Sequence, residues 1–352
     1  MARIMMKGNE AIAEGAIHAG CRFYFGYPIT PQNDVPEYLA RELPKVGGTF
    51  IQAESEVASI NMVLGAAAGG ARVMTSSSGP GVSLMQEGIS YLAGSELPGV
   101  IAYVSRVGPG LGGIAPTQGD YKQVTTGGGH GDYYTIALAP ASVEEMFSLT
   151  IKAFELADKY RNPAVVLADA ILGQMKEPVE IGPRPEVKEY LAEEKRSWAL
   201  YGNKGRESQL IKSLYLADGE MEDFNWRLDA KYKKMKEQDT YHEEFQTDDA
   251  EFLIVAFGSA SRMAQSAIDL AREEGYRVGL LRPITIYPYP EKAVAELSKR
   301  IPKVLVVEMN TGQMVKDVKV SADRDAEVFL YARPGGGLPT PDDILEQIKK
   351  YY

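Results

Sequence analysis

The sequence has almost no cysteine: among 352 residues there is one thiol, that of Cys21. A single cysteine excludes a disulfide framework within the chain. It also excludes an iron–sulfur cluster or a thiolate zinc site built from this chain alone, because each of these needs several thiolate ligands. Any electron transfer through such a cluster would therefore have to end on another polypeptide.

Histidine is scarce as well, and acidic residues outnumber basic ones. His18, His130 and His242 lie far apart in the sequence and lack the spacing of metal ligands, so we predict no metal site on this chain. The formal net charge is -10, and nearby acids interrupt the one basic cluster, at residues 231–234. Without a basic face, the chain is not expected to bind nucleic acid.

Long hydrophobic runs are also missing. No uninterrupted apolar stretch reaches the roughly 20 residues that span a bilayer, and the N-terminus lacks the hydrophobic core and cleavage site of a signal peptide. We therefore expect a cytoplasmic protein without a membrane segment. With 45% hydrophobic and 24% charged residues, the chain has the composition of a globular protein, and its length fits about two domains.

Strand and helix patterns alternate along most of the chain. In the first half, apolar strands are predicted at 22–25, 49–52, 71–75, 99–105 and 164–169, and helices at 10–19, 56–68, 82–93 and 142–159. A second series has a strand starting at residue 251, a helix at 261–274, and strands at 277–281, 304–308 and 327–330. These patterns predict an α/β fold with two mostly parallel sheets.

A charged stretch separates the two series. From Pro178 to Asp249 charge is dense and strand patterns disappear. We interpret this stretch as a connecting arm that is partly helical, and that either lies along a partner or forms a solvated linker. The predicted division is a first domain at 1–178, the arm at 179–249 and a second domain at 250–352.

An aromatic strand ends in a proline-rich turn at residues 24–32, Tyr-Phe-Gly-Tyr-Pro-Ile-Thr-Pro-Gln. Pro28 and Pro31 fix the backbone and hold the hydroxyl of Thr30 at the end of the strand. In a parallel sheet, that edge is where ligands bind. The alternative is an ordinary strand-to-helix connection in which Thr30 or Asn33 caps the next helix.

Two carboxylates, Glu54 and Glu56, lie at the entry of the otherwise apolar helix at 57–68. A carboxylate in this place can complement the helix dipole, which is worth about 0.3–1 kcal/mol. Alternatively, a buried Glu56 shares a proton with a heterocyclic nitrogen, which suits the tautomerisation of a cofactor. The spacing alone leaves both interpretations open.

Arg106 ends an apolar strand, where a guanidinium can either grip a carboxylate bidentately or form a surface salt bridge. Two glycine-rich turns, at 75–81 and 107–113, also follow strands, but neither matches the motif of a P-loop or of a dinucleotide site. The first is either an anion site or a structural turn. The loop at 127–133 is expected to approach a ligand or partner closely, with His130 as a hydrogen-bonding loop residue.

Several short motifs occur together along nearly the whole chain: residues 27–31, 54–56, 95–99, 105–106, 127–132, 281–285 and 308–313. Together they resemble the alpha subunit of 2-oxoacid:ferredoxin oxidoreductases. The likeness is greatest to the branch that acts on branched-chain 2-oxoacids or 2-oxoglutarate and splits its domains among polypeptides. It implies a thiamine diphosphate-binding domain of the pyrimidine type, followed by a transketolase C-terminal-like domain.

The resemblance also implies roles for individual residues. Glu56 would be the catalytic residue, bonding N1′ of the thiamine aminopyrimidine. Thr30 and Arg106 match the positions that hold the substrate carboxylate. The reaction would be oxidative decarboxylation of a 2-oxoacid, with one-electron transfers through iron–sulfur clusters to ferredoxin and formation of an acyl-coenzyme A. The other implied cofactor-binding residues are Tyr27, Pro28 and Ile29.

One absence agrees with a divided site. Thiamine enzymes usually hold the diphosphate and its Mg²⁺ with a GDG motif followed downstream by Asn, and this chain has no such pair. The resemblance therefore implies that a beta subunit supplies that half, and that gamma and ferredoxin-like delta subunits complete the complex and carry the clusters. Residues 105–108 depart from the Arg-Gly-Gly-Pro form found in much of the branch, which leaves the specificity for the substrate side chain open.

Other functions remain compatible with the sequence. Within the same chemistry, the chain could be a subunit of a pyruvate- or indolepyruvate-type oxidoreductase, or of an enzyme run in the carboxylating direction. A non-catalytic scaffold that only positions a beta subunit would keep the same fold. A nucleotide-binding protein would use the two glycine-rich turns.

Overall fold

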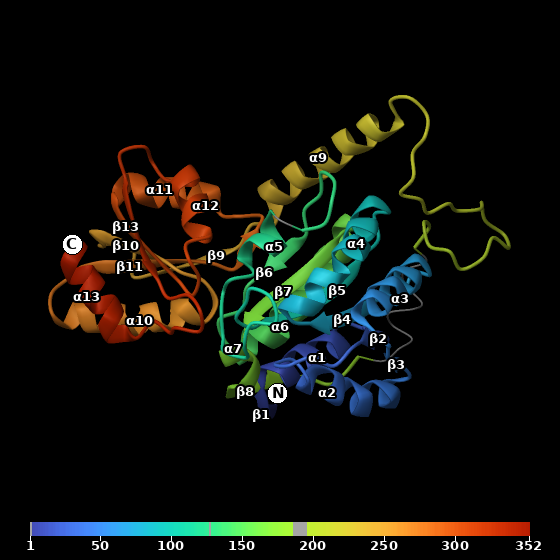
Figure 1. Ribbon diagram of the computed structural model, residues 1–352, viewed down its shortest axis with the longest axis horizontal. Coiled ribbons are helices and arrows are strands. Elements are labelled where there is room, and N and C mark those ends of the chain that lie inside the picture. Colours follow the sequence, from blue (N-terminus) through green and yellow to red (C-terminus); the bar gives the residue numbers. More distant parts are fainter. Residues whose placement is uncertain (1, 127, 186–195) are drawn as a thin grey trace.

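The computed structural model describes residues 2–126, 128–185 and 196–352, with two α/β units and a long helix beside them (Figure 1). The larger unit is built on a seven-stranded sheet of order β12-β6-β7-β5-β4-β2-β3. All neighbouring strands are parallel except β12, which runs antiparallel to β6. The strands are β2 (Phe23–Gly26), β3 (Thr49–Gln52), β4 (Val73–Ser77), β5 (Gly99–Ser105), β6 (Ile136–Leu138), β7 (Pro163–Asp169) and β12 (Thr285–Tyr287).

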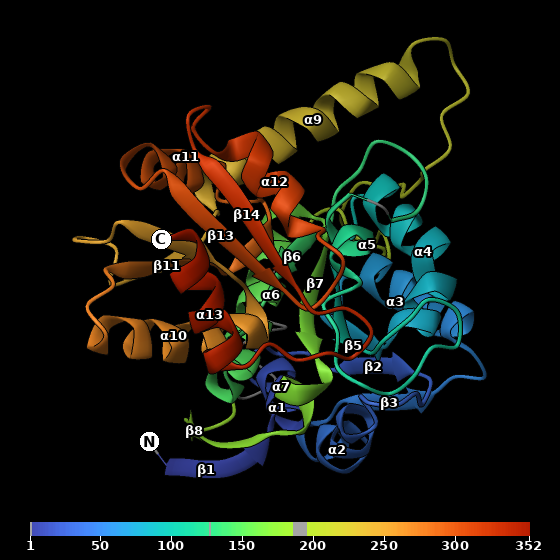
Figure 2. The ribbon, with the colours of Figure 1, turned by 60° about the vertical axis from the view of Figure 1, so that its left-hand side comes forward.

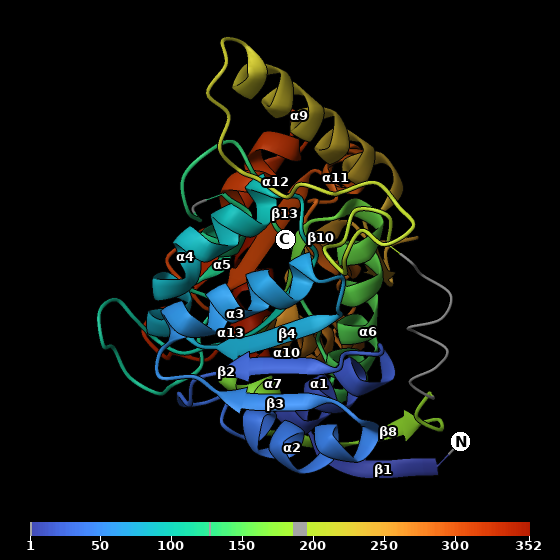
Figure 3. The same ribbon diagram turned by 90° about the vertical axis from the view of Figure 1, so that its right-hand side faces the viewer.

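Helices cover both faces of this sheet, as the unbroken apolar strands require. In β5, Ile101 packs with α3 and α4 on one face, whereas its neighbour Val100 packs with α1 and α6 on the other. Figure 3 shows the two layers on either side of the strands. The helices are α1 (Gly8–His18), α2 (Asp34–Glu42), α3 (Glu56–Ala68), α4 (Gly79–Gly94), α5 (Tyr121–Thr125), α6 (Val143–Tyr160) and α7 (Ala170–Gln174), with a 3-10 turn at Leu43–Val46.

The smaller unit contains a five-stranded sheet of order β14-β13-β10-β11-β9. Helices α10 and α13 lie on one face of it, and α11 and α12 pack on the other. The apolar cluster under α11 and α12 is continuous with the one under α3 and α4, so one core runs through both units. The elements are β9 (His242–Phe245), β10 (Phe252–Val255), β11 (Val278–Pro283), β13 (Lys303–Glu308), β14 (Glu327–Ala332), α10 (Gly258–Glu273), α11 (Glu291–Arg300), α12 (Met314–Ser321) and α13 (Pro341–Tyr351).

The α/β prediction is confirmed, but the stretch after Pro178 is not free of strands as expected. It contains the end of β8 (Lys176–Ile181), which pairs antiparallel with β1 (Ala2–Lys7), and it contains β9, which pairs antiparallel with β11. The second sheet is therefore not wholly parallel. β9 is short, polar and at the edge of its sheet, so its sequence carries no alternating apolar pattern.

The helical part of the charged stretch is α9 (Glu220–Gln238). It buries Phe224, Leu228, Tyr232 and Met235, spaced three or four residues apart, in the core cluster that includes α6. In Figure 2, α9 lies along the top of the molecule. Residues 186–195 of the predicted arm lie outside the described residues. Within the residues described, no helix has both the length and the apolar character needed to cross a bilayer.

Candidate active site

The candidate residues meet at one edge of the seven-stranded sheet. The turn at 27–31 follows β2, the turn with Ser78 and Gly79 follows β4, and Arg106 follows β5. Each therefore lies at the carboxyl end of one of three parallel strands. Glu56 begins α3 next to this edge. The sequence predicted the turn and Arg106 at strand ends and Glu56 at the entry of a helix, and the strand order places them beside one another.

A chain of hydrogen bonds fixes the turn at 27–31, which follows β2. The Tyr24 hydroxyl lies 2.6 Å from Ser76 Oγ, which donates to Gln32 Oε1 at 2.5 Å. Gln32 Nε2 then donates to the carbonyl of Tyr27 at 3.3 Å. Gly26 makes this arrangement possible, because a Cβ there would lie 2.2 Å from the Tyr24 hydroxyl.

The other end of the turn is held from α1 and α7. The carbonyl of Pro31 accepts hydrogen bonds from Asn9 Nδ2 at 2.8 Å and from Gln174 Nε2 at 2.9 Å. Both amides also bind the carboxylate of Asp34. Sequence analysis missed Asn9 and Gln174, because polar residues 22 and 143 positions from Pro31 give no local signal of their contact.

The side chains of the turn are directed to solvent. Tyr27, Pro28 and Thr30 are exposed, and Ile29 is half-buried. The backbone of the turn is therefore fixed while its side chains stay available to another molecule. The chain by itself does not enclose them.

Glu56 is the buried carboxylate of the site. Ser55 caps α3 by accepting from the amide of Ala58 at 3.2 Å, which leaves Glu56 as the first helical residue with only 6% of its surface exposed. Across the described residues, no donor forms a hydrogen bond with its carboxylate. Its oxygens are not among the fully buried unpartnered atoms, so the carboxylate keeps a narrow accessible side through which a ligand can donate a hydrogen bond.

The first turn of α4 presses against this carboxylate. A Cβ on Gly81 would lie 2.5 Å from Glu56 Oε1 and 2.1 Å from Ser77 Oγ, so only glycine fits. The hydroxyls around this turn are buried, and they have no hydrogen-bond partner in the part of the chain that the structure describes. They belong to Thr75, Ser77 and Ser78.

A second carboxylate, that of Asp120, lies near the first residue of α4, although in the sequence Asp120 directly precedes α5. Its Oδ2 lies 3.7 Å from where a Cβ of Gly79 would be. Burial raises the pKa of Asp120, and the neighbouring hydroxyls of Ser105 and Tyr103 oppose this rise only in part. The site therefore has two acidic groups of different environment, one of which, Asp120, sequence analysis did not single out.

Arg106 and Thr30 are brought together. Arg106 Nη1 donates to the carbonyl of Thr30 at 2.9 Å, and Nη2 reaches the carbonyl of Leu111 at 3.5 Å. The buried Nε has no partner among the described residues. The two Nη atoms of Arg106 thus contact backbone carbonyls, and Nε is the donor that an anionic group could still use.

The glycine-rich loop after α5 packs on the protein itself. Gly127 lies outside the described residues. A Cβ on Gly129 would lie 2.5 Å from the carbonyl of Gln86 in α4, so this glycine permits close packing on that helix. His130 is exposed, and its carbonyl accepts a hydrogen bond from Ser90 Oγ at 2.7 Å.

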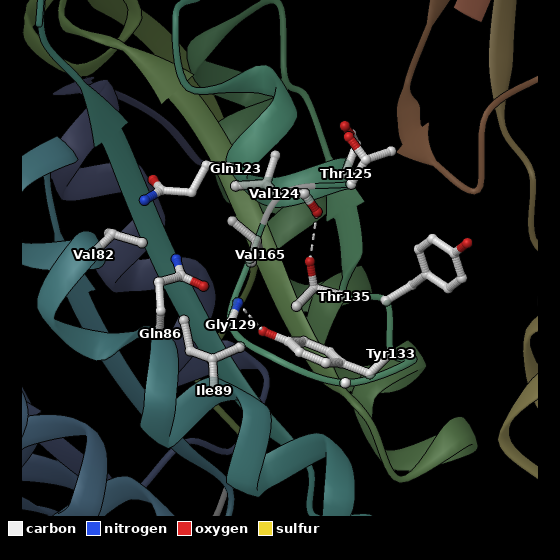
Figure 4. A pocket seen from close by; sticks show the side chains of 14 residues that line it. Val82, Gln86, Ile89, Gln123, Val124, Thr125, Gly129, Tyr133, Thr135 and Val165 are labelled. Carbon is white, nitrogen blue, oxygen red and sulfur yellow. Dashed lines mark hydrogen bonds between the residues drawn. The ribbon is translucent and has the colours of Figure 1, made fainter. Parts of the chain in front are cut away.

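A small cavity lies between α4, α5 and this loop (Figure 4). Its volume is about 60 Å³, and Tyr133 closes one side by accepting a hydrogen bond from the amide of Gly129 at 2.7 Å. Ligand pockets usually measure about 300–1,000 Å³, so this cavity does not hold a cofactor. The described part of the loop at 127–133 therefore packs closely against α4 of the same chain.

On the expectation that Glu56 is the catalytic residue, Gly81→Ala should reduce turnover about 100-fold, because the added methyl group displaces the Glu56 carboxylate and small misplacements of reacting groups have effects of this size. Steady-state kinetics of the assembled enzyme measures it. Gly65→Ala in α3 is the matched control, since a Cβ there meets nothing within 4 Å. Equal turnover in Gly81→Ala and Gly65→Ala would show that Gly81 does not confine Glu56.

Comparison with known proteins gives a consistent result. Residues 14–244 match the family described as pyruvate flavodoxin/ferredoxin oxidoreductase, thiamine diP-bdg. Residues 250–344 match pyruvate:ferredoxin oxidoreductase core domain II.

Individual relatives cover nearly the whole chain. The ketoisovalerate oxidoreductase subunit VorB of Methanothermobacter thermautotrophicus is 52% identical over 99% of this chain and 98% of its own. The 2-oxoglutarate synthase subunit KorA of Archaeoglobus fulgidus is 43% identical over 98% of both.

A solved structure shares the fold. The 2-oxoglutarate:ferredoxin oxidoreductase of Magnetococcus marinus, with 2-oxoglutarate, coenzyme A and succinyl-CoA bound, is 28% identical, with a TM-score of 0.88 over 99% of this chain. This chain spans 65% of that longer one.

Proposed function

Because the chain belongs to the 2-oxoacid:ferredoxin oxidoreductase family, we propose that it is the alpha subunit of an enzyme that oxidatively decarboxylates a 2-oxoacid to an acyl-coenzyme A. The observation that carries this proposal is the buried carboxylate of Glu56, which faces Gly81 and has no hydrogen-bond donor in the described chain. A non-catalytic scaffold would have no need to keep such a group buried.

The residues present fit the aminopyrimidine of thiamine diphosphate. That ring carries a nitrogen that bonds to a carboxyl group, and Glu56 offers a carboxyl group without another partner. When bound, the cofactor supplies the electron sink for decarboxylation. Glu56 holds the proton shared with the ring nitrogen, and the backbone of the fixed turn at 27–31 gives the ring a rigid edge.

Arg106 and Thr30 are the proposed substrate residues. The unpartnered Nε of Arg106 is the proposed donor to a carboxylate oxygen of the 2-oxoacid; because this atom is buried in the chain, substrate binding requires a local shift that uncovers it, while Nη1 remains on the carbonyl of Thr30. The exposed Thr30 hydroxyl completes this contact. A guanidinium oriented by the turn holds the substrate carboxylate beside the cofactor.

Partner chains complete the proposed site. The chain has no GDG motif, and its single thiol, Cys21, is buried, so Mg²⁺ and the iron–sulfur clusters are assigned to other subunits. We assign the diphosphate to a beta subunit and the electron path to gamma and ferredoxin-like delta subunits, with ferredoxin as acceptor. We place the complex in the cytoplasm.

The division at 178 and 249 is our proposal for the domain boundaries.

A branched-chain 2-oxoacid is the proposed substrate. Identity is 52% to the ketoisovalerate oxidoreductase subunit and 43% to the 2-oxoglutarate synthase subunit, over nearly the same length. 2-Oxoglutarate is the second candidate, because that relative is also matched end to end. The two acids share the carboxylate that Arg106 would bind and differ in the rest of the side chain.

The test is a substrate panel on the native complex, purified without oxygen. Its subunits are identified by mass spectrometry, and reduction of a dye is followed with 2-oxoisovalerate, 2-oxoglutarate, pyruvate and indolepyruvate, with and without coenzyme A. We expect reduction that depends on coenzyme A and is fastest with 2-oxoisovalerate. If reduction is fastest with 2-oxoglutarate, that acid replaces the branched-chain 2-oxoacid as the proposed substrate. No reduction with any 2-oxoacid would overturn the proposed function.

A further inference from the structure

The loop that begins at Arg106 returns to its own starting point. Arg106 forms an antiparallel bridge with Pro116, and the amide of Val107 donates to the carbonyl of Ala115 at 2.9 Å. The two legs of this loop, residues 106–116, therefore lie side by side. Whatever holds the chain just after Pro116 also holds Arg106.

The residues that follow, 117–122, form the base of the loop, and the second unit binds this base. Thr117 Oγ1 donates to the carbonyl of Met309 at 3.1 Å, and the amide of Gln118 donates to the same oxygen at 3.0 Å. Gln118 Oε1 accepts from the amide of Met309 at 3.0 Å. Gln118 Nε2 donates to the carbonyl of Phe257 at 2.7 Å.

One side chain of the second unit brackets the base. Gln313 Nε2 donates to the carbonyl of Gly119 at 2.6 Å, and Gln313 Oε1 accepts from the amide of Lys122 at 2.8 Å. A single amide group thus fixes the backbone on both sides of Asp120. Gln313 is 207 positions away from Arg106 in the sequence, so the contact exists only in the folded chain.

The corner that carries Gln313 is itself rigid. The buried carboxylate of Glu308 accepts hydrogen bonds from the amides of Gln313, Met314 and Val315 at 3.1, 2.8 and 2.9 Å, which fixes the start of α12. Asn310 Nδ2 donates both to Glu308 Oε2 at 2.8 Å and to the carbonyl of Gln118 at 3.0 Å. A fixed corner in the second unit therefore meets the base of a loop in the first.

We propose that Gln313 and Gln118 are positioning residues that set the place of the Arg106 guanidinium from the second unit. The inference rests on the proposed function, because it assigns Arg106 to the 2-oxoacid carboxylate. A loop with side-by-side legs transmits a shift at its base to its first residue. The side chains of Leu111 and Ile114, at its tip, are exposed.

The test replaces Gln313 by methionine, which has a similar size and forms neither hydrogen bond. We expect Gln313→Met in the assembled complex to raise the KM for the 2-oxoacid about tenfold, because two hydrogen bonds are lost, with the KM for coenzyme A unchanged. Thr117→Val, which removes the hydroxyl bound to Met309, is expected to act in the same direction. Arg262→Met is the matched control, because Arg262 also joins the units, at Ala141 and Glu177, but away from the loop.

Hydrogen exchange gives a second readout that needs no turnover. We expect Gln313→Met to speed the exchange of amides in residues 106–122, with the melting temperature close to that of wild type, whereas Arg262→Met leaves these amides unchanged. Unchanged exchange in Gln313→Met, or an unchanged KM for the 2-oxoacid, would overturn the inference. If the wild-type complex oxidises no 2-oxoacid, the proposed function is what fails, and hydrogen exchange still decides whether Gln313 fixes the loop.

Discussion

Glu56→Gln is expected to lower turnover of the assembled enzyme by about 10²- to 10⁴-fold, the range seen when a group that transfers a proton is lost. The amide has nearly the shape of the carboxyl group, so it fits the same space against Gly81 and Ser77. It cannot share a proton with the ring nitrogen of the cofactor in the same way. The measurement is dye reduction with saturating 2-oxoacid and coenzyme A, alongside the subunit composition of the complex.

The matched control is Glu54→Gln. Glu54 lies two residues earlier and is exposed, so the same change of charge occurs outside the buried site. We expect Glu54→Gln to keep wild-type turnover, and both variants to keep the partner subunits and bound thiamine diphosphate. Full turnover in Glu56→Gln would remove the catalytic role of this residue and favour the scaffold alternative.

Arg106→Met is expected to lower kcat/KM for the 2-oxoacid by about 10- to 100-fold, because the hydrogen bond from Nε to the substrate carboxylate, worth about 1.5–3 kcal/mol, is lost. Arg106→Lys is expected to recover only a small part of this loss. A lysine has the charge but lacks the flat pair of donors, and it cannot hold the carbonyl of Thr30 and a carboxylate in the same geometry. Steady-state kinetics with varied 2-oxoacid measures both.

The contact between Arg106 and Thr30 requires a control for structural damage. Added guanidinium ion should restore part of the activity of Arg106→Met if the turn at 27–31 keeps its place, since the ion fills the vacated position. Arg324→Met removes an arginine whose side chain is 90% exposed, and it should leave kcat/KM unchanged. A wild-type KM for the 2-oxoacid in Arg106→Met would assign substrate binding to other residues.

Local sequence pattern predicted the core of the fold because buried parallel strands read as continuous apolar runs. The predicted bounds of β3, α3 and β5 agree with the structure. Pattern failed where a strand pairs antiparallel with a distant one, as β1 does with β8 and β12 with β6. In such strands the pairing partner, rather than the local composition, decides the structure.

The candidate site was predictable to a similar depth. Sequence pattern placed Arg106 and the turn at 27–31 at the ends of parallel strands and Glu56 at the entry of a helix, and the structure brings the three to one edge of the sheet. The supporting contacts were not predictable. Gln313 reaches Gly119 across 194 positions, and Gln174 reaches Pro31 across 143. Side-chain amides have no periodicity that would reveal such partners, and their role follows only from the folded geometry.

The place of β12 affects the order in which the protein can fold during synthesis. β12 closes the edge of the first sheet but comes after three strands of the second sheet, β9, β10 and β11. A nascent chain that has left the ribosome only as far as residue 250 holds β6 with one side unpaired. Domains usually fold one after another as they emerge, from the N-terminus onward. Here the sheet of the first unit cannot be completed until part of the second unit has been translated.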